Sequence, residues 1–294
     1  MNRRGAQYCA PADTISEGLG RGAQQASPDT LKRGAKRMAH FTVENLSISF
    51  GGIKAVDSVS FEVEKNSIFS IIGPNGSGKT TIFNMISGIY KPDSGHVILD
   101  GQDMVGHRPD KIARKGIART FQNIQLFGNA TVMNNLMLGR HIHMKTGIIG
   151  GAFMWGKWSG TAKEEVKNRE IVEHIVDFLD LQALRDQFVS SLPYGKRKLV
   201  ELGRALALEP KVLLLDEPSA GMNTEEKEDL RIWIKDIQED YKVTILLIEH
   251  DMNMVMGISD KILAISQGIK ITEDIPSMVQ KHPEVIAAYL GEED

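Results

Sequence analysis

The sequence predicts an α/β protein in which a parallel sheet is joined by a smaller antiparallel sheet and a mostly helical insert. Three short and almost wholly apolar runs, at residues 67–72, 212–215 and 243–248, have the composition of strands that are buried on both faces. Helical patterns lie between and after these runs, which is the alternation typical of a parallel sheet. Residues 41–64 instead show short apolar alternations with turn residues between them, as antiparallel strands do.

The antiparallel strands are expected early in the chain. Apolar alternation predicts short strands at residues 41–43, 46–50, 59–63 and 97–99. Turn residues separate them, at Gly51-Gly52, at residues 91–95 and at Asp100-Gly101. The second half returns to the α/β pattern and ends in a strand pair at residues 261–265 and 270–272, joined by Gln267-Gly268, and in two short helices at residues 275–280 and 283–290.

The mostly helical insert is expected from about residue 129 to about residue 195. Its clearest helix covers about residues 162–181, where apolar residues recur at i, i+3, i+4 and i+7: Val172, Ile175, Val176 and Leu179. Residues 144–160 are Gly-rich and apolar and include Trp155 and Trp158. They would suit a loop that faces a partner or a membrane surface, although a loop folded over the domain's own helices is the favoured interpretation.

Composition excludes several classes of protein. The chain has 294 residues, with 35 Lys and Arg against 38 Asp and Glu, and a formal net charge of -3. This balance argues against a protein held on nucleic acid by bulk charge, so we expect no nucleic-acid partner. No apolar run approaches the roughly 18 residues of a membrane-spanning helix, so a membrane role requires a partner. Cys9 is the only cysteine, which excludes an intramolecular disulfide and fits a reducing compartment.

Residues 1–37 differ from the rest of the chain. They are rich in Gly, Ala, Arg, Ser and Gln and poor in apolar residues, so we expect a disordered extension before a single domain at residues 38–294. They lack the apolar core of a secretory signal, and Asp13, Glu17 and Asp29 argue against a targeting segment. A further hypothesis is that translation starts at Met38.

A phosphate-binding loop follows the first apolar run. The spacing G-x-x-x-x-G-K-[ST] is met by Gly73, Pro74, Asn75, Gly76, Ser77, Gly78, Lys79 and Thr80. The glycines let backbone N–H groups surround phosphate oxygens, and the helix that starts here, with Thr81 next along it, points its positive end at them. Lys79 supplies a cation for the β- and γ-phosphates, and the Thr80 hydroxyl supplies a ligand for Mg²⁺. The pattern therefore predicts a site for a nucleoside triphosphate, and a chance Gly-rich turn is the alternative.

Two carboxylates, Asp216 and Glu217, end the apolar run at residues 212–215. Many strands end in an acidic turn, so the pair alone indicates little. In a chain with a phosphate-binding loop, the strand would bring Asp216 beside the phosphates, where it can hold Mg²⁺ through water. Glu217 could then polarise an attacking water.

Three further residues are weaker candidates when each is taken alone. His250 follows the run at residues 243–248, at the edge of the sheet that faces a ligand, and could bond the γ-phosphate, although its position alone favours a merely exposed side chain. Gln122 follows a short strand and could reach Mg²⁺ or the water, but a solvated Gln is common. Phe50 ends a strand beside Gly51 and could stack an adenine ring, and a core aromatic is equally consistent.

One more candidate segment precedes an amphipathic helix and consists of Leu192, Pro193, Tyr194, Gly195 and Lys196. A Gly just before a helix start offers bare N–H groups to an anion. Considered alone, the segment is better explained as an ordinary loop and helix start.

In this order, the pieces resemble the ATP-binding cassette family of transporter ATPases from about residue 41 to the C-terminus. The resemblance implies a P-loop NTPase (RecA-like) core that hydrolyses ATP with Mg²⁺. It implies that Phe50 stacks adenine, that Gln122 contacts Mg²⁺, that Glu217 is the catalytic carboxylate and that His250 is the switch histidine. Residues 192–196 would be the signature motif, which acts on ATP held by the opposite subunit.

A closer likeness is to the ATP-binding subunits of branched-chain amino-acid importers. It rests on residues 49–56, 118–122, 220–223 and 284–291 and on the long insert around Trp155. It implies a peripheral subunit on the cytoplasmic face of the inner membrane, bound to two transmembrane permease subunits. A second, similar ATPase would complete a heterodimer or homodimer, and a solute-binding protein would deliver the solute.

The sequence departs from the family pattern at two places. The signature is commonly Leu-Ser-Gly-Gly-Gln, whereas Pro193, Tyr194 and Lys196 replace Ser, Gly and Gln here. Asn223 stands where Asp is usual in the turn called the D-loop. Both changes predict that the two ATP sites of a heterodimer are unequal. One alternative is a soluble cassette ATPase of DNA repair or translation. The sequence argues against it, because it has neither the long heptad repeats of repair members nor the second cassette of translation members. The other alternative is a regulatory module that is not coupled to transport.

Overall fold

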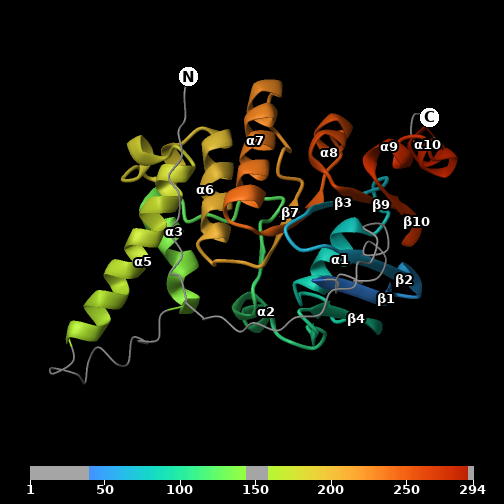
Figure 1. The fold of residues 1–294 in the computed structure, drawn as a ribbon, viewed down its shortest axis with the longest axis horizontal. Helices are drawn as coiled ribbons and strands as arrows, with labels where there is room; N and C mark the ends of the chain where they lie inside the picture. The colour runs from blue at the N-terminus through green and yellow to red at the C-terminus, as the bar shows by residue number, and fades with distance from the viewer. Residues whose placement is uncertain (1–39, 144–157, 291–294) are drawn as a thin grey trace, which may run out of the picture. The chain divides into compact units, whose positions relative to one another are not determined.

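The structure is a computed structural model that describes residues 40–143 and 158–290. Within these ranges a six-stranded, mostly parallel sheet and a four-stranded antiparallel sheet are packed with helices (Figure 1). The predicted α/β fold with a separate antiparallel sheet is confirmed. The expected disorder of residues 1–37, the hypothesis about Met38 and residues 144–157 of the loop expected at residues 144–160 lie outside the described residues. The expectation of a loop is wrong for residues 158–160, which form the first turn of a helix.

The parallel sheet has the strand order β10-β9-β3-β8-β7-β6, in which only β10 is antiparallel to its neighbour. Its strands are β3 (Ile68–Ile72), β6 (Ile117–Arg119), β7 (Val212–Asp216), β8 (Thr244–Ile248), β9 (Lys261–Ser266) and β10 (Ile269–Asp274). Side chains alternate between two hydrophobic clusters. On β7, for example, Leu213 and Leu215 enter one cluster while Val212 and Leu214 enter the other. Burial on both faces is the reason that these strands are continuous apolar runs in the sequence.

The antiparallel sheet has the strand order β2-β1-β4-β5. Its strands are β1 (Phe41–Phe50), β2 (Ile53–Val63), β4 (Ser94–Leu99) and β5 (Gln102–Asp103). The prediction of separate strands at residues 41–43 and 46–50 is wrong, because a bulge joins them into β1. Asn45 occupies the bulge with a φ of 47°, and its N–H donates to Ser60 Oγ at 2.7 Å. The turn predicted at residues 91–95 is also shorter than expected. Strand β4 already begins at Ser94, which pairs with Ser47 of β1.

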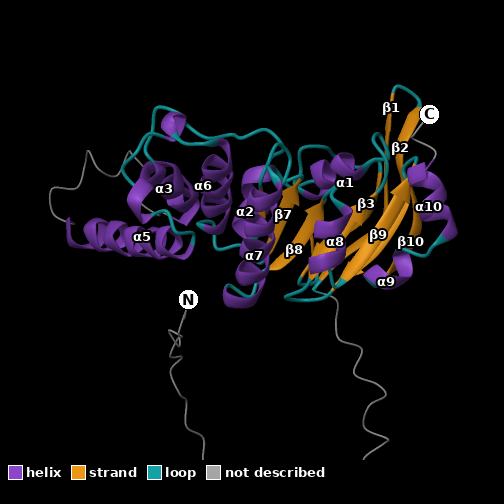
Figure 2. Cartoon of the chain, turned by 90° about the horizontal axis from the view of Figure 1, so that it is seen from above, coloured by secondary structure: helices purple, strands orange, loops and turns teal. Residues whose placement is uncertain are grey.

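Helices cover both faces of the parallel sheet (Figure 2). Helix α1 (Lys79–Ile86) follows β3 and packs Ile82, Phe83 and Ile86 into a cluster that both sheets share. The other helices outside the insert are α2 (Pro109–Lys115), α7 (Thr224–Asp240), α8 (Met252–Ile258), α9 (Pro276–Val279) and α10 (Pro283–Leu290). In the described ranges, none of the helices combines the length and apolar character that crossing a membrane requires.

The region predicted as a helical insert contains α3 (Val132–Arg140), η1 (His141–His143), α5 (Trp158–Phe178), η2 (Gln182–Leu184), η3 (Val189–Ser191) and the start of α6 (Tyr194–Leu206). Helices α3, α5 and α6 lie together beside the β6 edge of the sheet in both views (Figure 1). Helix α5 begins and ends earlier than the predicted span of 162–181, and the residues of its predicted apolar face are buried. It ends before Asp180, which adopts a φ of 53° that a right-handed helix does not allow.

Candidate functional site

The predicted phosphate-binding loop joins the end of β3 to the start of α1. Gly73 leaves the strand with a φ of 156°, and a Cβ there would lie 2.1 Å from the carbonyl oxygen of Ile265 on β9. Gly78 precedes α1 with a φ of 100°, and its Cβ would lie 2.7 Å from the carbonyl oxygen of Ala55 on β2. Backbone atoms of both sheets therefore set the path of the loop, and only glycine fits at these two positions.

Lys79 is buried at the first position of α1. Its Nζ donates to the carbonyl oxygens of Gly73 at 2.6 Å and Pro74 at 2.8 Å, which curls the loop around the ammonium group. The first N–H groups of a helix have no carbonyl partner within that helix, so this end of α1 can bind an anion. The other residues of the motif differ in exposure: Asn75, Gly76 and Thr80 are exposed, Gly78 and Thr81 are half-buried, and Ser77 is buried.

Asp216 is the last residue of β7, and it is only 2% exposed. Its Oδ2 accepts a hydrogen bond from Nη2 of Arg119 at 2.7 Å. Burial raises the pKa of the Asp216 carboxyl, and the hydrogen bond from Arg119 opposes that rise. The second oxygen, Oδ1, is buried and has no hydrogen-bond partner among the described residues. A carboxylate oxygen in that condition suits a water molecule in the shell of Mg²⁺, so the residues present fit this cation.

Glu217 lies between two side chains that come from distant parts of the chain. Its Oε2 accepts from Nε2 of Gln122 at 2.6 Å, and its Oε1 lies 2.8 Å from Nε2 of His250. Glu217 has a φ of 47°, which turns the chain directly after β7 and directs the carboxylate away from the core. The structure thus brings together three predicted site residues, from the ends of β6, β7 and β8. A carboxylate held on both oxygens in this way can accept a proton from a water molecule in a fixed direction.

Phe50 is at the end of β1, and its side chain is 45% exposed. The alternative that Phe50 is a core aromatic is therefore wrong. Its ring meets Tyr90 edge-on, with 5.3 Å between the ring centroids. Tyr90 was not predicted, because a Tyr after a helix carries no pattern that points to this pairing. An exposed ring braced by a second ring is a surface on which a planar base can stack.

Within residues 192–196, Leu192 and Pro193 precede α6, and the other three residues form its first turn. Pro193 is the residue before the helix, Tyr194 is its first residue and Gly195 lies in its first turn. The prediction that Gly195 precedes the helix is wrong, because Tyr194 is already helical and Pro193 takes the N-cap position with an extended ψ of 154°. A Cβ on Gly195 would lie 2.5 Å from Oε1 of Glu226. Leu192 is buried and Lys196 is half-buried, while Tyr194 is 44% exposed.

Asn223 caps the start of α7. Its side-chain oxygen accepts from the N–H of Glu226 at 2.9 Å, and Glu226 accepts from the N–H of Asn223 at 3.0 Å. This reciprocal pair is a capping box, which Asn makes as well as Asp does. The replacement of the usual Asp therefore leaves the helix start intact.

Two residues at the site were missed from the sequence. Arg119 pairs with Asp216, and also donates to Oδ1 of Asn84 at 2.7 Å. Glu249 is buried and accepts from the N–H of Ser219 at 2.7 Å and from the N–H of His250 at 3.1 Å, so it fixes the turns that follow β7 and β8. The one available signal was the position of Glu249 directly after an apolar run, since a charge there needs a partner.

Comparison with known proteins gives two family matches. A family model described as "ABC transporter" matches residues 56–220, and one described as "Branched-chain amino acid ATP-binding cassette transporter" matches residues 270–294. Among similar proteins are the high-affinity branched-chain amino acid transport ATP-binding proteins BraF of Pseudomonas aeruginosa and LivG of Escherichia coli. They are 40% identical over 250 residues and 39% identical over 251 residues, and each alignment covers 85% of this chain and 97% of the relative.

Solved structures support the same family. An ATP-binding cassette of an ABC transporter in its ADP conformation matches with a TM-score of 0.75 and 34% identity, covering 87% of this chain and all of that one. A nucleotide-free ATP-binding cassette matches with a TM-score of 0.74 and 33% identity, covering 87% of this chain. The extent of the family match, the identity to curated relatives and the loop geometry together show that the chain belongs to the ABC transporter family, as an ATP-binding cassette that hydrolyses ATP.

Proposed function

We propose that the chain is the ATP-hydrolysing subunit of an importer for branched-chain amino acids or related compounds. The match of residues 270–294 to the branched-chain transporter family supports this solute class more than any other observation. The similarity to BraF and LivG over 85% of the chain supports it further. Hydrolysis itself is carried by the Glu217 carboxylate, which Gln122 and His250 hold in place.

ATP binds between the antiparallel sheet and the start of α1. Phe50 stacks the adenine ring, and the N–H groups of residues 73–81 surround the phosphates, with Lys79 supplying positive charge. Thr80, Asp216 and Gln122 hold Mg²⁺, Asp216 through water on its buried Oδ1. When bound, Mg²⁺ supplies charge that neutralises the phosphate oxygens.

Glu217 acts as the general base. A water oxygen attacks the γ-phosphorus, the bond from that phosphorus to the oxygen of ADP breaks, and the water proton passes to the Glu217 carboxylate. Gln122 orients this carboxylate and the water, and His250 holds its other oxygen and contacts the γ-phosphate. The Glu217 side chain is 17% exposed, so a water molecule can reach its carboxylate.

The working assembly contains two cassettes, either two copies of this chain or this chain and a similar one. Residues 192–196 act in trans on the ATP of the partner cassette, with Pro193 and Lys196 making that contact unlike the common signature. The pair binds transmembrane permease subunits on the cytoplasmic face of the inner membrane, and a solute-binding protein delivers the solute. Loss of the γ-phosphate opens the dimer, which resets the permease.

The solute assignment is tested by uptake. Cells that carry the natural chain should take up radiolabelled leucine from dilute medium, and cells that carry only Glu217→Gln should not, since the carboxylate that drives the cycle is gone. Cells that carry Glu225→Gln, an exposed residue in the first turn of α7, are the matched control and should match the natural chain. Full leucine uptake with Glu217→Gln would contradict the proposal.

Lys79→Ala should weaken ATP affinity by about 10- to 100-fold, because hydrogen bonds to a charged group contribute roughly 1.5–3 kcal/mol. Titration calorimetry of the purified chain with Mg·ATP measures the change. Lys65→Ala removes an exposed Lys in the turn before β3 and should leave affinity unchanged. Equal affinity in Lys79→Ala and Lys65→Ala would remove Lys79 from phosphate binding.

Glu217→Gln should slow ATP hydrolysis by roughly 10²–10⁴-fold, since that is the usual loss when a general base is removed. ATP affinity should stay within a few fold, because Gln keeps the shape and one hydrogen-bond acceptor. Phosphate release under saturating ATP measures the rate, with Glu225→Gln as the control. An unchanged rate would exclude Glu217 as the base.

Phe50→Ala should weaken nucleotide affinity by roughly 10-fold, since stacking of a base on an aromatic ring contributes about 1–3 kcal/mol. Its thermal unfolding temperature should hardly change, because the side chain is exposed. Ile53→Ala, which is 75% exposed on the next strand, is the control for lost apolar surface. Affinity that is unchanged in Phe50→Ala, or equally weakened in Ile53→Ala, would exclude adenine stacking on Phe50.

A further inference from the structure

Three charged residues of α6 bind the backbone of the loop that carries Gln122. Nζ of Lys198 donates to the carbonyl oxygen of Gln122 at 3.0 Å. Oε1 of Glu201 accepts from the N–H of Phe121 at 3.5 Å and from the N–H of Gln125 at 3.4 Å. Arg204 donates through Nη1 to the carbonyl oxygen of the same Gln125. Four backbone groups of residues 121–125 are therefore held by one helix.

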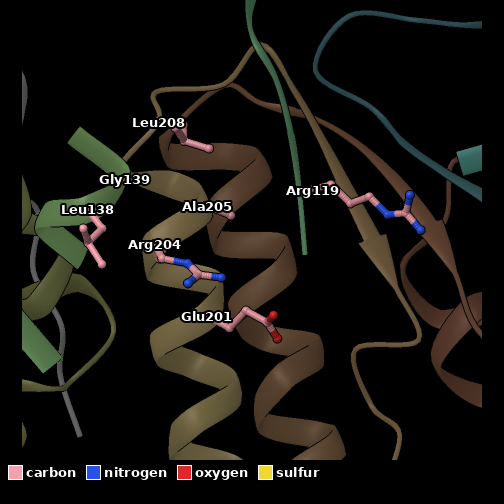
Figure 3. Close-up of a pocket in the computed structure, with 7 residues that line it drawn as sticks. All are labelled: Arg119, Leu138, Gly139, Glu201, Arg204, Ala205 and Leu208. Atoms are coloured by element: carbon pink, nitrogen blue, oxygen red, sulfur yellow. The ribbon is translucent and has the colours of Figure 1, made fainter. Parts of the chain in front are cut away.

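The three residues share one face of α6, because they are spaced at i, i+3 and i+6. Figure 3 shows Glu201 and Arg204 extending from that face in the same direction, in a groove of about 270 Å³ that Arg119 also lines. Lys198 and Glu201 are only 5% and 2% exposed. Burial lowers the pKa of Lys198 and raises the pKa of Glu201, so both charges are kept at a cost.

Helix α6 does not need these buried charges in order to pack. Its apolar residues already hold it in the core: Leu199, Val200, Leu202, Ala205 and Leu206. The charged groups contact the loop instead. The same loop presents the Gln122 amide to Glu217 at 2.6 Å. The contacts thus form a continuous path from these side chains of α6, through the loop backbone and the Gln122 amide, to the Glu217 carboxylate.

We propose that Lys198, Glu201 and Arg204 are positioning residues that fix the backbone of the loop at residues 121–125 and so keep the Gln122 amide on the Glu217 carboxylate. This inference rests on the proposed role of Glu217 and extends it.

The first test measures the loop directly, by hydrogen exchange of a peptide covering residues 120–126 in the full chain. Glu201→Ala removes the acceptor of two N–H groups, so their exchange should become about 10-fold faster or more. Glu201→Gln keeps an acceptor oxygen and should restore much of the protection. Arg140→Ala is the matched control, since Arg140 is also buried and charged but binds Asn168 and the carbonyl oxygen of Ala207.

Unchanged exchange in Glu201→Ala, or equally faster exchange in Arg140→Ala, would overturn the proposal. This measurement does not depend on turnover. A failure of the proposed catalytic role of Glu217 and a failure of the positioning role are therefore distinguished.

The second test is a double-mutant cycle on ATP turnover. Glu201→Ala should lower kcat by about 10-fold with little change in KM for ATP, because misplacing a catalytic group slows chemistry while the phosphate loop is intact. Glu201→Gln should recover much of kcat. In a Gln122→Ala background, Glu201→Ala should cause no further loss, since the path to Glu217 is already broken. Losses that multiply in the double variant, or a fall that Glu201→Gln does not relieve, would contradict the positioning role.

Discussion

The parallel register of β6, β7 and β8 is the constraint on which the candidate site depends. Arg119 pairs with Leu214, and Asp216 pairs with Ile248, so the three strands end at the same edge of the sheet. The loops that follow them bring Gln122 and His250 to Glu217, although they are 95 and 33 residues away along the chain. A shift of register by one residue would turn the side chains of a strand to the opposite face and disrupt the contacts of Glu217 with Gln122 and His250.

A buried charge pair at that edge connects the end of α1 to Asp216. Arg119 bonds Asp216 on β7 and reaches Asn84 and Ser87 on α1, while its guanidinium lies over the rings of Phe83 and Phe121 at 5.8 and 5.2 Å. A buried pair is worth little in net stability, but losing one partner leaves an unpaired charge and costs several kcal/mol. The pair therefore holds α1, β6 and β7 in one arrangement.

Sequence reasoning succeeded where a local pattern determines the structure. Apolar runs gave the buried strands, and the glycine spacing gave the loop before Lys79, because each depends on neighbouring residues only. It failed where the partners of a residue are distant in the sequence, and where a strand or helix extends past residues that are typical of turns. The bulge at Asn45 keeps β1 continuous, and α6 begins at Tyr194, earlier than expected. Neither the Arg119–Asp216 pair nor the contacts of Glu201 could be predicted, since both depend on strand register and helix placement.

A crystal structure of the full chain with Mg²⁺ and a non-hydrolysable ATP analogue tests the central claim most directly. The account predicts the phosphates against the N–H groups of residues 73–81, and a water within about 2.6–3.2 Å of the Glu217 carboxylate that faces the γ-phosphorus. Gln122 and His250 should still contact the carboxylate or that water. A nucleotide bound elsewhere, or a Glu217 side chain turned away from the γ-phosphate while Mg²⁺ is in place, would contradict it.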